Sequence, residues 1–113
     1  MALRKSERGR VTRSSGNVFA DLKLVNAEEK RAKVRLAAAI NQIIEDQHLS
    51  QNAAARQLKI NQPKISALSN YRLEGFSVER LMNFLTALNR DVEIVIRRKT
   101  RSGKAGRILV SAA

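Results

Sequence analysis

The sequence predicts a small, mainly α-helical bundle that carries one β-strand toward its C-terminal end. The first observation is that residues 27–47, 50–58 and 77–88 place apolar side chains at helical spacing. The second is that residues 91–97 alternate apolar and polar side chains, which is typical of a half-buried strand. The third is size: 113 residues with 43% hydrophobic and 4% aromatic content suffice for one domain with a mainly aliphatic core.

The chain opens with a basic segment, residues 1–16, that offers almost nothing apolar to fold around. Its positive charges are Arg4, Lys5, Arg8, Arg10 and Arg13. We expect a flexible arm, which either follows a nucleic-acid backbone or is a solvated tail. No apolar block follows these charges as in a secretory signal, and no stretch of the sequence is long enough to span a bilayer.

An apolar cluster and a long support helix come next. Phe19, Leu22 and Leu24 form the cluster, which we expect to brace the core. Asn26 can cap the following helix, and Glu29 stands three residues later, as in a capping box. Over residues 27–47 the apolar positions of the predicted helix are Leu36, Ile40, Ile43 and Ile44.

Residues 49–68 read LSQNAAARQLKINQPKISAL and predict two short helices joined by a tight turn. Ser50 is a suitable N-cap for the first helix, which ends near Leu58, and the alanines at 53–55 allow a second helix to cross closely. Asn61 can cap the second helix, and Pro63 lies near its first position, where a missing N–H costs nothing. This arrangement is typical of a helix-turn-helix reader of DNA.

The N-terminal end of the second short helix is expected to meet base edges, because an α-helix fits the major groove. Gln62 can pair with adenine, and Lys64 can reach guanine or a phosphate. Ser66 and Ala67 can touch a base edge or a thymine methyl group, while Gln51 can hold a phosphate from the first helix. The predicted DNA-contacting residues are Gln51, Asn52, Asn61, Gln62, Pro63, Lys64, Ser66, Ala67, Asn70 and Arg72.

A further helix, a strand and a basic tail are predicted after this motif. Ser77 can cap the helix, whose apolar side chains repeat at Val78, Leu81, Leu85 and Leu88. In the strand that follows, alternate residues share one face, and Arg97 lies on the opposite face from Ile94 and Ile96. We expect residues 99–113 to form a flexible basic tail.

A lone strand needs a partner for its N–H and C=O groups, and the preceding helices offer none. We expect a second copy of the chain to supply it, so that a homodimer presents two reading helices about one DNA turn apart. Two alternatives remain open, namely a hairpin with Ile108, Leu109 and Val110, or pairing with the sheet of another protein. The predicted dimer contacts are Val92, Glu93, Ile94, Val95 and Ile96.

The charge of the chain indicates a polyanionic partner. Lys and Arg number 22 against 10 Asp and Glu, which gives a net charge of +12 and a pI near 11.3. Ribosomal and membrane-surface proteins share such a charge. The charge by itself favours a nucleic acid over these alternatives, and the helix-turn-helix motif strengthens this interpretation. The absence of cysteine excludes disulfides, thiolate metal sites and cysteine nucleophiles.

Catalysis finds no support in the sequence. His48 is the single histidine and lies at a predicted helix end, where a cation is favourable and no partner for general-base chemistry is evident. No glycine-rich phosphate loop, zinc-ligand spacing or Ser-His-Asp set occurs. We therefore expect a protein that is not an enzyme and uses no metal or cofactor.

The helix-turn-helix stretch resembles the Cro/C1-type (Xre) family, whose pattern is Leu-Thr/Ser-Gln, a small alanine, and Gln-x-x-Ile-Ser in the recognition helix. Lys59 and Tyr71 depart from this family, which commonly has glycine at both positions. Residues 17–22, 76–81 and 91–96 also resemble the subgroup of HigA-type antitoxins. The residues that match the family pattern are Leu49, Ser50, Gln51, Ala54, Gln62, Ile65 and Ser66.

The resemblance implies a lambda-repressor-like helix-turn-helix bundle over residues 17–98 and a sequence-specific repressor that binds double-stranded DNA in a prokaryotic cytoplasm. The antitoxin subgroup further implies repression of its own operon and a small ribonuclease toxin of the RelE/HigB class as partner. The alternatives are a stand-alone transcriptional regulator without a toxin and a general basic nucleic-acid-binding protein.

Overall fold

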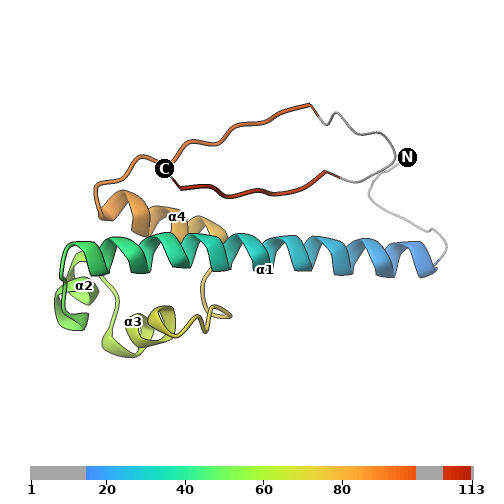
Figure 1. Ribbon diagram of the computed structural model, residues 1–113. Coiled ribbons are helices and arrows are strands. Elements are labelled where there is room, and N and C mark those ends of the chain that lie inside the picture. Colours follow the sequence, from blue (N-terminus) through green and yellow to red (C-terminus); the bar gives the residue numbers. More distant parts are fainter. Residues whose placement is uncertain (1–14, 99–105, 113) are drawn as a thin grey trace.

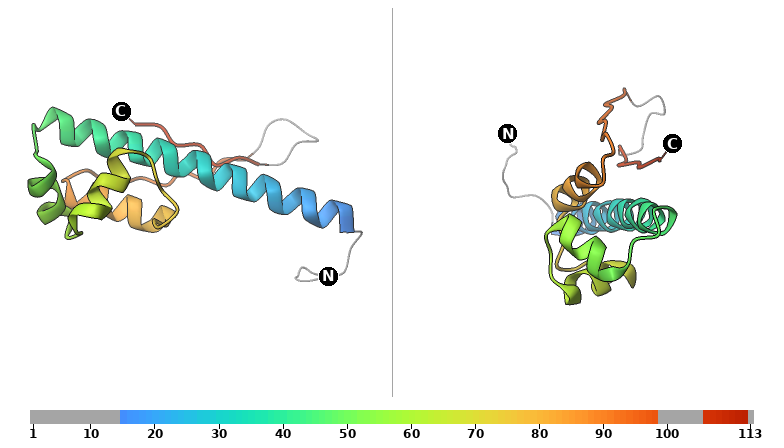
Figure 2. Two further views of the ribbon diagram at one scale, coloured as in Figure 1. Left: turned by 90° about the horizontal axis from the view of Figure 1, so that it is seen from below. Right: turned by 90° about the vertical axis from the view of Figure 1, so that its left-hand side faces the viewer.

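The computed structural model describes residues 15–98 and 106–112 of the chain (Figure 1). The helices of this part are α1 (Ser15–Asp46), α2 (Gln51–Leu58), α3 (Gln62–Ser69) and α4 (Val78–Ala87). The three short helices gather around the C-terminal half of α1, and the N-terminal half of α1 projects beyond them (Figure 2). In the view of Figure 1, α2 and α3 lie below α1, whereas α4 and the C-terminal segments lie above it. The mainly α-helical class is therefore confirmed.

The start of the support helix is not where the sequence predicts it. α1 runs without interruption from Ser15 to Asp46, so Asn26 lies inside the helix and is not its N-cap. Extending an existing helix adds one backbone hydrogen bond per residue and needs no new nucleation, which overrides the capping tendency of Asn26. Glu29 closes no capping box and instead lies 3.8 Å from the Nζ of Lys33, one turn further along the helix.

Two predictions for the N-terminal region lie largely outside the described part of the chain. Residues 15 and 16, expected in a flexible arm, form the first turn of α1, and residues 1–14 are outside the described residues. The side chains of Phe19, Leu22 and Leu24, expected to brace the core, are also outside it. Although α1 has 32 residues, no described helix combines the length and apolar character needed to cross a membrane.

The core lies between α1 and the three short helices and is aliphatic, as the composition predicts. Burying each large aliphatic side chain stabilises the fold by roughly 1.5 to 3 kcal/mol. Phe76 and Phe84 add an edge-to-face contact with ring centroids 5.9 Å apart. The largest fully buried side chains are Ile40, Ile65, Leu68, Leu81 and Leu88.

Every described helix is followed by a residue in the left-handed backbone conformation, and none of these residues is glycine. In each case the next N–H donates to a carbonyl five residues back, as Ile60 does to Ala55 at 3.0 Å and Arg72 to Ala67 at 2.9 Å. This Schellman arrangement satisfies carbonyls that the helix leaves free. The four residues and their φ angles are His48 (55°), Lys59 (59°), Tyr71 (59°) and Asn89 (65°).

The β-strand predicted for residues 91–97 is absent from the described part of the chain, so this prediction is wrong for the single chain. A strand requires a hydrogen-bonding partner, and no backbone hydrogen bond joins residues 90–98 to residues 106–112. Val92 packs against the core at the start of the segment. Beyond it Ile94, Val95 and Ile96 are 73%, 62% and 92% exposed.

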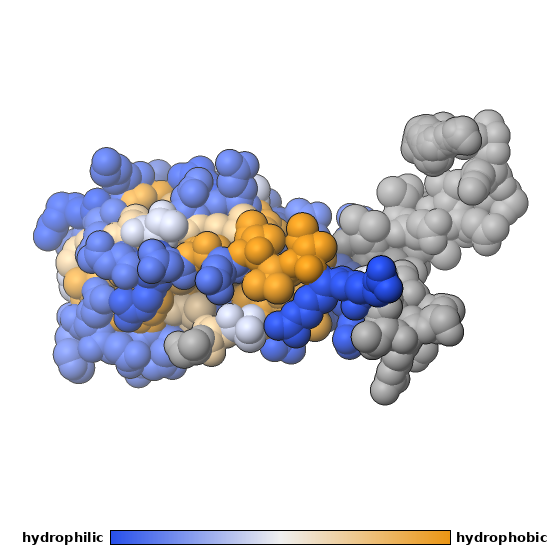
Figure 3. All heavy atoms as spheres, turned by 90° about the horizontal axis from the view of Figure 1, so that it is seen from above, coloured by the Kyte–Doolittle hydropathy of each residue, from blue (hydrophilic) through white to orange (hydrophobic). Residues whose placement is uncertain are grey.

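The last described segment, residues 106–112, lies above α1 in Figure 1 and does not form the alternative hairpin. The backbone N–H of Ile108 donates to a carboxylate oxygen of Glu28 on α1 at 3.1 Å. Val110 is half-buried and packs against the core, whereas Leu109 is 73% exposed. Figure 3 shows the apolar patch on this face of the molecule. Apolar side chains from both C-terminal segments thus remain uncovered.

Candidate nucleic-acid interface

The turn between α2 and α3 is built from local signals. The Ser50 hydroxyl accepts a hydrogen bond from the Ala53 N–H at 3.1 Å, and the Asn61 side-chain oxygen accepts one from the Lys64 N–H at 2.9 Å. Pro63 lies in the first turn of α3, where it replaces an N–H that has no partner in the helix. Lys59, in the left-handed conformation, ends α2 and turns the chain toward α3. The caps predicted at Ser50 and Asn61 are confirmed.

Small side chains allow α3 to lie against the rest of the bundle. Ala54 and Ala55 on α2 are 0% and 8% exposed, and Ile65 and Leu68 bury the inner face of α3. The side-chain amide of Asn41 on α1 donates to the backbone carbonyl of Leu68 at 3.1 Å. This hydrogen bond ties the C-terminal end of α3 to α1. The sequence pattern does not predict this role of Asn41, because a polar residue inside a helix gives no local sign of a distant partner.

The N-terminal end of α3 faces solvent. Asn61, Gln62 and Pro63 are all exposed, while Ile65 in the next turn is 1% exposed. The backbone N–H groups at this end have no intrahelical acceptor, so the end attracts anions and hydrogen-bond acceptors. In Figure 1, α3 lies on the opposite side of α1 from the C-terminal segments, so those segments leave this end uncovered.

A hydrogen bond joins the first residues of the two short helices. Gln62 Nε2 on α3 donates to Gln51 Oε1 on α2 at 3.2 Å, and both side chains are exposed. The bond holds the Gln62 amide in one direction and leaves its carbonyl oxygen and second N–H free. A free carbonyl and N–H on one amide are the groups that pair with N6 and N7 of adenine. The structure thus places Gln51 where it can orient Gln62, beyond the phosphate contact expected from the sequence.

Lys64 has a different environment from the one that its position in the sequence suggests. Its side chain is half-buried, and its ammonium group lies 5.2 Å from the centre of the Phe76 ring. A cation in this position is attracted by the negative face of the ring. Gly75 leaves room for the ammonium, because a Cβ added there would lie 3.1 Å from Nζ. The ammonium of Lys64 is therefore held by the loop after α3 and not at the exposed end of the helix.

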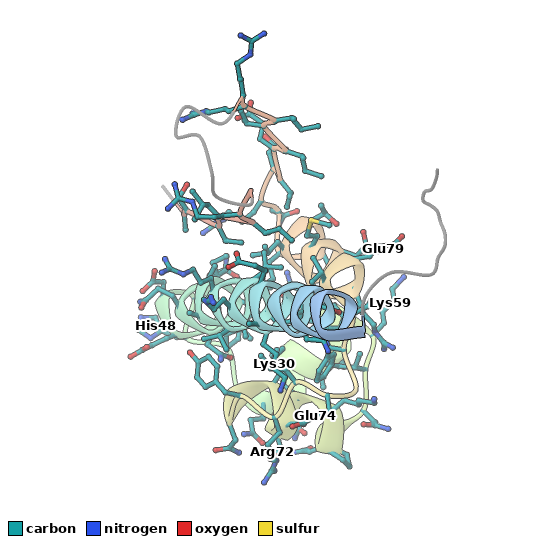
Figure 4. The ribbon with its side chains drawn as sticks, turned by 90° about the vertical axis from the view of Figure 1, so that its right-hand side faces the viewer. Lys30, His48, Lys59, Arg72, Glu74 and Glu79 are labelled. Carbon is teal, nitrogen blue, oxygen red and sulfur yellow. The ribbon has the colours of Figure 1, made fainter. Side chains whose placement is uncertain are left out.

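The remaining predicted contact residues lie along and beyond α3. Ser66 and Ala67 are half-buried, and Asn52 is exposed on α2. The Asn70 amide donates to the Ser66 carbonyl at 2.9 Å, which leaves the Asn70 side-chain oxygen free. Arg72 is exposed and lies on the α3 side of the molecule, away from α1 (Figure 4). All ten predicted residues fall on α2, α3 and the turns that flank α3.

Side chains that could hold a metal ion do not gather in the described residues. No three His, Asp or Glu side chains of that part come together as a metal would require. His48 is exposed after the last turn of α1, in the left-handed conformation that ends the helix. A groove of about 410 Å³ between α2 and α4 is open and carries the opposite charges of Glu79 and Arg80. The exposed end of α3 is therefore the best-formed candidate site.

Comparisons with known proteins agree with this geometry. A family model described as a helix-turn-helix domain matches residues 18–97. One solved structure, whose name assigns it provisionally to the XRE family of transcriptional regulators, is 64% identical in sequence with a TM-score of 0.74. The match covers 78% of this chain and 99% of that chain. The comparison with curated proteins finds no match. The matched residues include all of α2, α3 and α4.

Proposed function

The chain belongs to the helix-turn-helix domain family, and on that premise we propose that it is a repressor that binds one DNA sequence as a homodimer. It is a DNA-binding transcriptional regulator of the XRE type. Beyond membership of this class, we propose a role in repression, a set of DNA-contacting residues and a dimeric state.

The observation that carries the proposal is the exposed end of α3 with its oriented amide. Gln62 is held by Gln51 at 3.2 Å, and neighbouring Asn61 and Pro63 are exposed. In a major groove, the amide of Gln62 would meet the N6 and N7 atoms of an adenine. Gln51, Asn52, Asn70 and Arg72 would hold phosphates on either side, which sets the register of the helix on the duplex. Base contacts at one end and phosphate contacts around it are what sequence-specific binding requires.

The basic charge supports the same proposal. A net charge of +12 favours binding to any duplex through release of condensed counterions. We expect the logarithm of the binding constant to fall with the logarithm of salt concentration by about 0.9 for each phosphate contacted. Charge therefore sets the affinity for all DNA, and the end of α3 sets the preference for one site.

Substitution of Gln62 tests the contact residues. The unsubstituted protein is first used to select its preferred duplex from a random pool. We expect Gln62→Ala to weaken binding to this selected duplex by roughly 1 to 3 kcal/mol. Binding to unselected duplex should change little, because phosphate contacts remain. Gel shifts on both duplexes measure the difference, and Gln42→Ala, an exposed glutamine on α1, is the matched control. Equal losses on both duplexes would contradict base recognition by Gln62.

We further propose that the protein is the antitoxin of a toxin–antitoxin pair and represses its own operon. The resemblance of residues 17–22, 76–81 and 91–96 to HigA-type antitoxins supports this role. Ile108 and Leu109, which lie outside residues 91–97 and are 55% and 73% exposed, also support it, because uncovered apolar patches mark protein interaction sites. A partner on the face opposite α3, where these side chains lie, would leave the DNA-reading end of α3 free.

Co-expression tests the antitoxin role. The open reading frame that adjoins the gene is expressed together with the full chain, and the chain is purified through a tag. We expect a small ribonuclease of the RelE/HigB class to copurify in a fixed ratio and to lose its RNA cleavage in the complex. An adjoining gene whose product neither copurifies nor cleaves RNA would leave a stand-alone regulator.

A further inference from the structure

Residues 91–97 carry a charge pattern that is complementary to itself when reversed. The order is Asp-Val-Glu-Ile-Val-Ile-Arg, with Val95 at the centre of the last five residues. Two residues before Val95 stands Glu93, and two residues after it stands Arg97. Ile94 and Ile96 flank Val95 on either side. Reversing the direction of the segment therefore exchanges an acid for a base and leaves the apolar residues in place.

The structure leaves these groups free to pair. Glu93 and Arg97 are exposed, and within the described residues neither takes part in an ion pair. Ile94 and Ile96 are among the most exposed large apolar side chains, at 73% and 92%. The segment begins at the end of α4 and runs on the side of α1 opposite α3 (Figure 1). A chain that pairs here would not cover the DNA-reading end of α3.

We infer that this segment pairs antiparallel with the same segment of a second copy, in the register that places Val95 opposite the partner's Val95. The inference rests on the homodimer proposed above and specifies its register. In this register Ile94 faces the partner's Ile96, and Glu93 faces the partner's Arg97. The two-fold axis repeats both pairs, so two charge pairs and two isoleucine pairs stabilise the dimer. Directly opposed cross-strand pairs of these kinds are favourable.

The neighbouring registers are less favourable. If the centre moves to Ile94, Asp91 faces the partner's Arg97 and Val92 faces the partner's Ile96, which are favourable pairs. In that register, however, the Glu93 carboxylate faces apolar Val95 of the partner, and Arg90 faces the partner's Arg98, so like charges meet. If the centre moves to Ile96, Ile94 faces the partner's Arg98 and Val95 faces the partner's Arg97. A parallel arrangement brings Glu93 close to its own copy. Within residues 91–98, the arrangement centred on Val95 therefore pairs Glu93 with Arg97 and Ile94 with Ile96, and it brings no like charges together.

Charge reversal tests the register in the full-length protein. We expect the unsubstituted chain to be a dimer in analytical ultracentrifugation. In this register residue 93 of each copy faces residue 97 of the other. Glu93→Arg therefore places two arginines opposite each other in both of these pairs, and Arg97→Glu places two glutamates opposite each other. We expect either substitution to weaken self-association by about tenfold or more at low salt, and by less at high salt. The double variant Glu93→Arg/Arg97→Glu restores opposite charges and should restore the dimer.

Mixing the two single variants gives the sharpest test. In a heterodimer of Glu93→Arg with Arg97→Glu, both cross-strand pairs again join an acid and a base. We therefore expect the mixture to form heterodimers more tightly than either variant forms homodimers, by about tenfold or more. Arg98→Glu changes the charge equally but lies on the other face of the strand, and it should leave the Glu93 pairs intact. Circular dichroism and thermal unfolding confirm that each variant folds.

The possible results distinguish a wrong register from the absence of a dimer. A dimer that tolerates both single reversals, or a double variant that does not regain the dimer, overturns the register and leaves the homodimer standing. Weakening by Arg98→Glu as large as that by Arg97→Glu also overturns it, because bulk charge would then explain both. A chain that stays monomeric at all concentrations overturns both the register and the proposed homodimer, while DNA recognition by Gln62 is measured separately.

Discussion

At the scale of single residues, the backbone angles of Lys59 and Tyr71 explain why related sequences place glycine there. Both residues have φ of 59°, in the left-handed region. A side chain in this region costs roughly 1 to 2 kcal/mol, which glycine avoids. The departures from the family pattern therefore leave the turn and the Schellman ends of α2 and α3 in place. Their consequence is a lower stability and not a different bend.

Replacing Lys59 with glycine should stabilise the fold. We expect Lys59→Gly to unfold at higher urea concentration than Lys59→Ala, with a difference in free energy of unfolding of about 1 kcal/mol. Alanine is the matched control because it removes the same exposed side chain but keeps the left-handed cost. Equal stability of the two variants would show that the turn relaxes away from the left-handed conformation without cost.

Lys64 provides a second residue-scale prediction. Its ammonium lies over Phe76 and beside Gly75, away from the exposed tip formed by Asn61 and Gln62. We expect it to neutralise a phosphate and not to read a base. Lys64→Met keeps most of the apolar stem and removes the charge, so it should weaken binding to selected and unselected duplexes alike. The salt dependence of log affinity should become shallower by about 0.9. A loss confined to the selected duplex would instead assign Lys64 to a base.

At the scale of elements, the angle of α3 depends on contacts from outside the motif. Ile65 and Leu68 fix its inner face in the core, and Asn41 on α1 holds the carbonyl of Leu68 at 3.1 Å. Gln57 at the end of α2 similarly donates to the carbonyl of Ala87 at the end of α4, at 3.2 Å. The two short helices are thus joined to α1 and α4 by side-chain hydrogen bonds to helix ends. These bonds hold α2 and α3 in place relative to the bundle.

Removing the Asn41 bond should loosen α3. We expect Asn41→Ala to lower the free energy of unfolding by about 1 kcal/mol, because the Leu68 carbonyl loses the donor on α1 and keeps only the backbone N–H of Tyr71, at 3.2 Å, among the hydrogen bonds of the described residues. Gln42→Ala is the control, since Gln42 is exposed and, among the described residues, its side chain bonds to exposed Asp46. Its effect should stay within about 0.5 kcal/mol. Urea denaturation measures both. If the two substitutions cost the same, the bond to Leu68 does not anchor α3.

Local signals predicted the elements around α3 well and the start of α1 poorly. The caps at Ser50, Asn61 and Ser77 lie where expected, because a capping side chain and the N–H that it accepts from are only three residues apart. The cap expected at Asn26 is absent, because the residues before Asn26 are themselves helical and an N-cap can form only where a helix begins. A cap signal is therefore decisive only where no helix already precedes it.

At the scale of the whole molecule, the two faces differ in the character of their exposed side chains. α3 lies on one side of α1 and has exposed polar side chains at its N-terminal end, and the C-terminal segments lie on the other side (Figure 1). Figure 3 shows the apolar patch on the face of the C-terminal segments. Ile94, Ile96 and Leu109 are each more than half exposed, at 73%, 92% and 73%. Such a patch is costly in water unless another chain covers it. The arrangement suits a protein that binds DNA with one face and a second chain with the other.

Dimer formation should couple to binding of a two-part DNA site. Glu93→Arg, which is expected to weaken self-association, should bind a duplex with half of the selected site as the unsubstituted chain does. The affinity of Glu93→Arg for the full site should be about tenfold lower than that of the unsubstituted chain. This difference should appear at protein concentrations where the variant is not fully dimeric, because the loss of affinity follows the loss of the dimer. Gel shifts on the two duplexes measure this difference. Equal binding of both proteins to the full site would mean that each recognition helix acts alone.

The sequence by itself determined the helices around α3, their caps, the inward-facing residues Ile65 and Leu68 and the exposed position of Gln62. Those features depend on interactions between residues that are at most a few positions apart, so the local pattern contains their cause. Only the tertiary structure decided the hydrogen bond between Gln62 and Gln51, the place of the Lys64 ammonium over Phe76 and the irregular form of residues 91–97. Each of these depends on a partner that is distant in the chain, and for residues 91–97 the described chain supplies none.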